Sequence, residues 1–272
     1  MDGIRRGNQG ANIVAGHKSV SQLLAYSGCS ERYYLERIRR APQTPAGWTL
    51  QGLAVHETVE AWERSGRALD GRALRQIYND TWQKHYARML RDEPDVNRWL
   101  TGNIRVKGET DVQRRFDRGY DQVDFYISDA LSAEWAIWET PDYDPAIELP
   151  FAIDLDGVEV IGYIDQIREW PDGSLEIVDV KTGSKTPDWD LQLGMYRLAI
   201  IEAYELAGPV SGSFFMLKDG KYVPAKNLEA YTRDRLTAWF KSLDRGVESQ
   251  VYLPNPGSQC RICSVWKYCS AT

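Results

Sequence analysis

The chain has 272 residues, of which 43% are hydrophobic and 26% charged, and its formal net charge is −6 at pH 7. This composition is typical of a folded globular protein and excludes a disordered or fibrous one. The apolar runs are too short to span a membrane, and residues 1–6 lack the apolar core of a signal peptide. We therefore expect a cytoplasmic protein without membrane contacts.

The charge is unevenly distributed along the chain. Residues 1–45 carry a net charge of +4 and residues 260–272 carry +2, whereas residues 142–179 hold eleven acidic residues against one Arg168. We interpret most of these charges as solvated surface. The distribution also fits a basic lobe that binds phosphates beside an acidic metal pocket.

The first half of the chain is predicted to be helical. A flexible lead-in of residues 1–18 precedes a helical region over 19–139, which carries Cys29 and His56. Ser19 and Gln22 form a capping box, and apolar residues then recur at three- and four-residue spacing. The predicted helices cover residues 19–26, 31–39, 48–65, 70–91 and 109–138.

A β-rich core is predicted over residues 140–247. The turns at Asp156-Gly157 and Asp172-Gly173 predict an antiparallel three-stranded meander, to which a helix, two more strands and another helix are added. The strands are expected at 147–153, 158–170, 175–180, 210–217 and 221–225, and the helices at 188–207 and 228–245. This order predicts an α+β fold, followed by a cysteine-containing segment over 248–272.

The predicted hairpin of residues 158–180 ends in charged residues where burial is expected. Asp165 lies late in its first strand, and Asp179 and Lys181 end the second strand on one shared face. Two carboxylates could bind a divalent cation, and the backbone carbonyl of Val180 could add a third ligand. Lys181 could orient or deprotonate a water molecule there, although a simple Lys–Asp ion pair is the alternative.

Two helices offer further candidate residues. His56 follows Gly52 on one helix face, and the glycine would let a metal or the backbone approach closely. Spacing alone favours a structural role for His56. Gln192 and Tyr196 share a face of the helix that follows the hairpin, where they could hold a phosphate or a water molecule.

The four cysteines indicate a second metal site. Cys260, Cys263 and Cys269 lie within ten residues of one another, and Cys29 lies some 230 residues earlier. Four thiolates suit either Zn²⁺ or an iron–sulfur cluster, and spacing does not choose between them. Such a site would join the two ends of the chain.

The ordered set of motifs resembles the RecB-like branch of the PD-(D/E)xK nuclease superfamily over about residues 19–270. One cysteine before the core and Cys-x₂-Cys-x₅-Cys after it resemble the iron–sulfur subgroup of that branch. This subgroup includes CRISPR-associated and phage RecB-like exonucleases and the nuclease domain of AddB helicase–nucleases. The motifs are Gly52-x₃-His56, Gly162-x₂-Asp165, Asp179-x-Lys181 and Gln192-x₃-Tyr196.

The resemblance implies a restriction-endonuclease-like core, in which a mixed central sheet is flanked by helices, and an iron–sulfur lobe. It implies that Lys181 is the catalytic lysine and that Gln192 and Tyr196 support the site and contact DNA. It further implies a [4Fe–4S] cluster on Cys29, Cys260, Cys263 and Cys269. The implied Mg²⁺ or Mn²⁺ ligands are His56, Asp165, Asp179 and the Val180 carbonyl.

Together these features predict a metal-dependent DNA exonuclease that acts on single strands or DNA ends. Phage DNA processing, recombination, repair and CRISPR spacer acquisition are possible settings, with recombination or CRISPR-adaptation proteins as possible partners. The alternative is a non-catalytic DNA-binding or assembly module that carries the cluster or zinc.

Overall fold

The computed structural model describes residues 16–271, so most of the predicted lead-in lies outside the described residues. A six-stranded mixed sheet forms the centre, in the order β1-β3-β4-β5-β6, with β2 paired to β3. Strands β2, β3 and β4 form the predicted antiparallel meander, and β4 and β5 are parallel. The strands are β1 (Ala136–Ile137), β2 (Ile147–Leu155), β3 (Val158–Glu169), β4 (Leu175–Lys181), β5 (Val210–Met216) and β6 (Lys221–Pro224).

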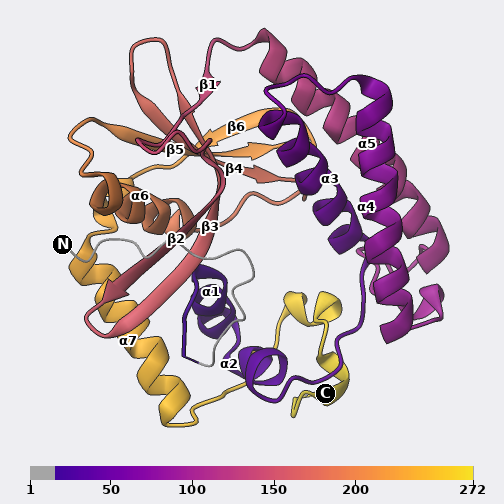
Figure 1. Ribbon diagram of the computed structural model, residues 1–272. Coiled ribbons are helices and arrows are strands. Elements are labelled where there is room, and N and C mark those ends of the chain that lie inside the picture. Colours follow the sequence, from indigo (N-terminus) through magenta and orange to yellow (C-terminus); the bar gives the residue numbers. More distant parts are fainter. Residues whose placement is uncertain (1–15, 272) are drawn as a thin grey trace.

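Helices cover both faces of this sheet (Figure 1). One hydrophobic core joins the sheet to α1, α6 and α7, and a second joins it to α3, α4 and α5. Residues alternate between these cores along β4, since Ile177 belongs to the first and Val178 and Val180 to the second. The helices are α1 (Val20–Gly28), α2 (Ser30–Tyr33), α3 (Gly47–Arg64), α4 (Gly71–Asp92), α5 (Gly108–Ser132), α6 (Leu191–Tyr204) and α7 (Arg233–Glu248).

The α+β prediction is confirmed, but some predicted helix ends are wrong. The helix expected over 109–138 ends at Ser132, because Trp135 packs under the buried guanidinium of Arg168 and the next residues join the sheet as β1. Tertiary packing here outweighs the helical spacing of the apolar residues. The last predicted helix starts later than expected, at Arg233, where the Thr232 hydroxyl accepts a hydrogen bond from the Arg235 backbone N–H.

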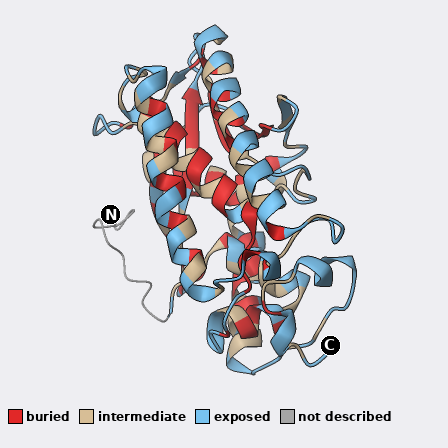
Figure 2. Ribbon diagram, turned by 90° about the vertical axis from the view of Figure 1, so that its right-hand side faces the viewer, coloured by how far each residue is buried: buried red, intermediate tan, exposed pale blue. Residues whose placement is uncertain are grey.

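The two ends of the described chain meet in a small lobe, in which α2 packs against residues 251–270. The Leu253 carbonyl accepts a hydrogen bond from the Glu31 backbone N–H, and the Glu31 carboxylate accepts two from Ser270. Among the residues that the structure describes, the buried apolar core of this lobe consists of Leu35, Ala41 and Val265. Figure 2 shows this lobe, near the C-terminus, as largely exposed or intermediate.

Within residues 16–271, we find no helix with the length and apolarity that crossing a membrane requires.

Candidate active site

The site begins where β3 and β4 separate. Their antiparallel ladder runs from the turn to the pair Gln166–Val178 and stops there. Beyond it, the Val180 backbone N–H donates to the Asp165 carboxylate at 3.0 Å. A side chain thus replaces a strand carbonyl as the acceptor, and the separated strands leave room for polar groups.

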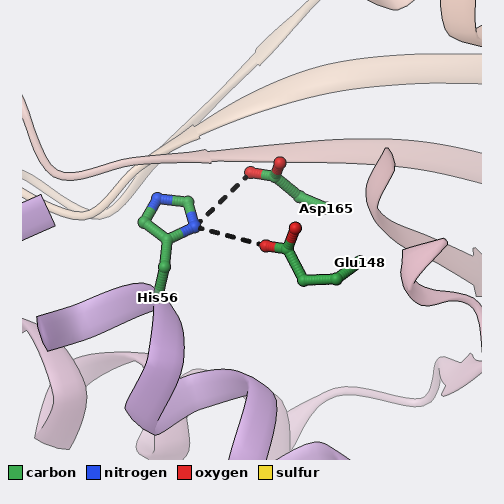
Figure 3. A group of neighbouring side chains, drawn as sticks. All are labelled: His56, Glu148 and Asp165. Carbon is green, nitrogen blue, oxygen red and sulfur yellow. Dashed lines mark ion pairs between the residues drawn. The ribbon is translucent and has the colours of Figure 1, made fainter. Parts of the chain in front are cut away.

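Three side chains from three elements converge at this point (Figure 3). His56 reaches the sheet from α3, and its Nδ1 lies 3.7 Å from Asp165 Oδ2 and 3.9 Å from Glu148 Oε1. One ligand atom from each residue lies within 4.8 Å of the other two. A Cβ on Gly52 would meet only Thr182 Oγ1, at 3.5 Å, so no described backbone atom approaches this glycine closely.

Glu148 in β2 was not predicted from the sequence. Its φ of 44° lies in the left-handed region, which is costly for a residue other than glycine. The β2–β3 ladder pairs Ile147 and Leu149 with residues of β3 but skips Glu148, so the strand is locally distorted where the carboxylate joins the site. The available signal was a charged residue between two apolar strand positions, in the most acidic part of the chain.

The other predicted residues form a continuous polar chain beside this cluster. The Lys181 ammonium lies 2.5 Å from Asp179 Oδ2 and donates to Gln192 Oε1 at 3.2 Å. The Gln192 amide donates in turn to the Tyr196 hydroxyl at 2.7 Å. These contacts bring the end of β4 and the first turns of α6 together, as strand and helix periodicity predicted.

Gly162 helps to position Tyr196. A Cβ at Gly162 would lie 2.7 Å from the Phe151 ring, which packs over this glycine from the neighbouring strand. The Phe151 ring then meets Tyr196 edge-on, with centroids 5.7 Å apart. The glycine is therefore needed for the close approach that fixes Tyr196.

The electrostatics of the cluster favour neutral carboxyl groups in the absence of a cation. Burial raises the pKa of Asp179, and the nearby Asp165 raises it further, while Lys181 opposes both effects. Burial likewise raises the pKa of Asp165. Burial and the charges of Asp165 and Glu60 raise the pKa of Glu148 to about 8, whereas burial lowers the pKa of His56. The environment favours the uncharged form of all four groups.

These residues fit a hard divalent cation. Asp179 is 1% exposed, and its Oδ2 lies 2.5 Å from the Lys181 ammonium, whereas Oδ1 has no hydrogen-bond partner among the described residues. A buried carboxylate oxygen without a partner is costly unless a further polar group or a metal ion satisfies it. Glu148, Asp165 and His56 add oxygen and nitrogen ligands of the kind that Mn²⁺ and Mg²⁺ accept.

The four cysteines line a single cavity of about 190 Å³ in the terminal lobe. Cys29 is the residue between α1 and α2, and the other three come from the C-terminal segment. Among the described residues, no three of these sulfurs lie within 4.8 Å of one another. All four cysteines of the chain are thus gathered around this cavity.

Comparison with known proteins identifies the family. The pattern of the PD-(D/E)XK nuclease superfamily matches residues 17–270. The Gene 69 protein of Mycobacterium phage D29 is 36% identical over 261 residues, covering 93% of this chain and 96% of that protein. The Gene 69 protein of Mycobacterium phage L5 is 32% identical over 276 residues, covering 91% and 94%. The mixed sheet brings acidic residues and a lysine together at one point, in agreement with this match. The chain belongs to the PD-(D/E)XK nuclease superfamily.

Proposed function

We propose that this protein is a Mg²⁺- or Mn²⁺-dependent deoxyribonuclease that degrades single-stranded DNA or DNA ends as an exonuclease. The observation that carries the proposal is the convergence of His56, Glu148 and Asp165 on one point, near the buried Asp179 carboxylate that contacts Lys181. Membership of the nuclease superfamily supports DNA as the substrate. The similarity to mycobacteriophage proteins supports a role in phage DNA processing.

We assign the metal ligands to His56, Asp165, Asp179 and the Val180 carbonyl, and we add Glu148 to them. The Val180 backbone raises the pKa of His56, which supports the placement of this carbonyl beside the imidazole. When bound, the cation supplies charge to stabilise the phosphorane-like transition state and the leaving oxygen. The imidazole favours Mn²⁺ over Mg²⁺, because Mg²⁺ prefers an all-oxygen set.

Lys181 is the residue that we assign to the attacking water. Its ammonium is held between Asp179 and Gln192, so it can donate a hydrogen bond to a water molecule or to a phosphoryl oxygen without reorganising. Tyr196 is buried, and burial raises its pKa, so its hydroxyl stays protonated and keeps the Gln192 amide in place. Gln192 and Tyr196 therefore orient the lysine and line the approach of the strand.

We assign a [4Fe–4S] cluster to the four cysteines, in keeping with the RecB-like iron–sulfur subgroup. Tetrahedral Zn²⁺ with Zn–S bonds of about 2.3 Å requires sulfurs about 3.8 Å apart, and no three of these thiols approach within 4.8 Å in the described chain. A larger group suits their wider spacing and the cavity of about 190 Å³. The lobe also has only three buried apolar core residues, so it needs a further stabilising element.

Two measurements test these assignments. The wild-type protein should degrade end-labelled single-stranded DNA in Mn²⁺ or Mg²⁺ and lose this activity in EDTA. Full retention of the label with every cation would refute the nuclease proposal. For the lobe, anaerobically purified protein should be brown and contain about four iron and four sulfide per chain; a colourless protein with stoichiometric zinc would refute the cluster.

A further inference from the structure

The segment between β4 and α6 places a tryptophan beside the catalytic lysine. Trp189 lies two residues before the start of α6 and is 49% exposed, which is unusual for so large an apolar ring. It lines a pocket of about 500 Å³ together with Lys181 and Gln192. The size lies within the range of pockets that bind small organic groups, about 300–1,000 Å³.

Leu24 and Gly28 of α1 and the neighbouring Pro187 also line this pocket, as do Ser27 and Asp188. The Asp188 carboxylate is paired with Lys185, so the pocket combines apolar surface with the ammonium and amide of Lys181 and Gln192. An aromatic or heterocyclic ring next to an anionic phosphate has the complementary chemistry. A nucleotide carries both groups in one molecule, joined through its sugar.

The Trp189 ring is held in place by other aromatic residues. It stacks on Trp239 of α7, with centroids 5.9 Å apart and an interplanar angle of 22°. Trp239 is itself fixed by an edge contact with Tyr231, at 6.1 Å. One face of the Trp189 ring is therefore covered. Because the ring is already held in place, its side chain loses little conformational entropy when a ligand stacks on the open face.

We propose that Trp189 is a stacking platform for an unpaired base of the strand whose phosphate lies at Lys181. This inference rests on the proposed nuclease function and adds to it a residue that discriminates single-stranded from duplex DNA. Bases within a duplex are already stacked and paired, so they reach the ring only after unpairing, which costs a few kcal/mol. Trp189 thereby favours single strands and frayed ends over intact duplex.

The first test measures the binding of a labelled single-stranded oligonucleotide by fluorescence anisotropy in EDTA, where no cleavage interferes. Trp189→Ala should weaken binding about 5-fold to 150-fold, the change that corresponds to about 1–3 kcal/mol for one stacked base. Trp189→Phe should retain most of the affinity, because it keeps a ring. The matched control is Trp170→Ala, which removes a partly exposed tryptophan at the far end of the β3–β4 hairpin.

The second test changes the DNA and not the protein, so it does not depend on whether a variant folds. An abasic nucleotide is moved through the oligonucleotide one position at a time. With wild-type protein, one position should show the same loss of affinity as Trp189→Ala, and with Trp189→Ala that abasic site should cause no further loss. The proposal would be overturned if the losses of affinity caused by Trp189→Ala and by the abasic site added up at every position. An unchanged affinity of Trp189→Ala would also overturn it.

The outcomes separate this inference from the proposed function. If the wild-type protein degrades DNA and Trp189→Ala binds single strands as tightly as wild type, the nuclease stands and the stacking role is wrong. Equal weakening of single-stranded and duplex binding by Trp189→Ala would also contradict the inference.

Discussion

Replacing Glu148 by glutamine should stabilise the metal-free protein at alkaline pH and weaken its affinity for Mn²⁺. The carboxyl group titrates near 8 in the folded chain and near 4.5 when unperturbed. The folded state therefore holds the proton more tightly, and the free energy of unfolding falls as the pH rises from about 4.5 to about 8. Glutamine does not titrate, so the variant lacks the part of this decline in unfolding free energy that comes from Glu148.

The magnitude follows from the same titration. At about 1.4 kcal/mol per pH unit, the loss for Glu148 over this interval is at most about 5 kcal/mol. The side chain is 32% exposed, so water screens part of the effect and about 1–3 kcal/mol is the realistic size. In a protein of this length, that corresponds to a rise in Tm of roughly 2–10 °C at pH 8.5.

Thermal unfolding followed by circular dichroism in EDTA, at pH 5 and pH 8.5, measures the effect. Glu148→Gln and wild type should have the same Tm at pH 5 and diverge at pH 8.5, and Mn²⁺ should raise the Tm of the variant less than that of wild type. Glu169→Gln, at the exposed last position of β3, is the matched control. Equal Tm values for variant and wild type at pH 8.5, with equal gains from Mn²⁺, would refute the placement of Glu148 in a cation site.

Three further variants test other parts of the account. Lys181→Met should lower kcat at least about 100-fold while Mn²⁺ still raises the Tm, and near-normal cleavage would refute its role. Tyr196→Phe should lower kcat by a smaller factor, about ten-fold, because Gln192 loses only one hydrogen bond; no change in kcat would contradict its positioning role. Cys263→Ser should lower the iron content and the Tm of the terminal lobe, and retention of both would contradict the cluster.

Local periodicity predicted the part of the site that lies close together in the sequence. Strand alternation placed Asp179 and Lys181 on one face, and helical spacing did the same for Gln192 and Tyr196; the structure brings these four into one chain of contacts. Such rules work because each pair is separated by a single strand repeat or helical turn. The Asp-Gly pairs at 156–157 and 172–173 separately predicted the turns that make β2, β3 and β4 a meander.

The long-range part of the site could not be predicted in this way. Spacing alone favoured a structural role for His56, because nothing local says that α3 meets the sheet at Asp165, about 110 residues later. Glu148 was missed because its left-handed backbone breaks the strand alternation on which the prediction relied. Trp135 and β1 were assigned to a helix because the buried Arg168 that holds them lies more than 30 residues away.

The most direct test of the central claim compares wild type with Asp179→Ala on single-stranded DNA labelled at either end, in Mn²⁺, Mg²⁺ and EDTA. Burial and the nearby Asp165 raise the pKa of Asp179, so removing its carboxyl group should leave the metal-free fold intact, and any loss of activity reports on the site. We predict cation-dependent degradation by wild type and none by the folded variant. Cleavage by Asp179→Ala, or cleavage by wild type in EDTA, would contradict the metal-dependent mechanism.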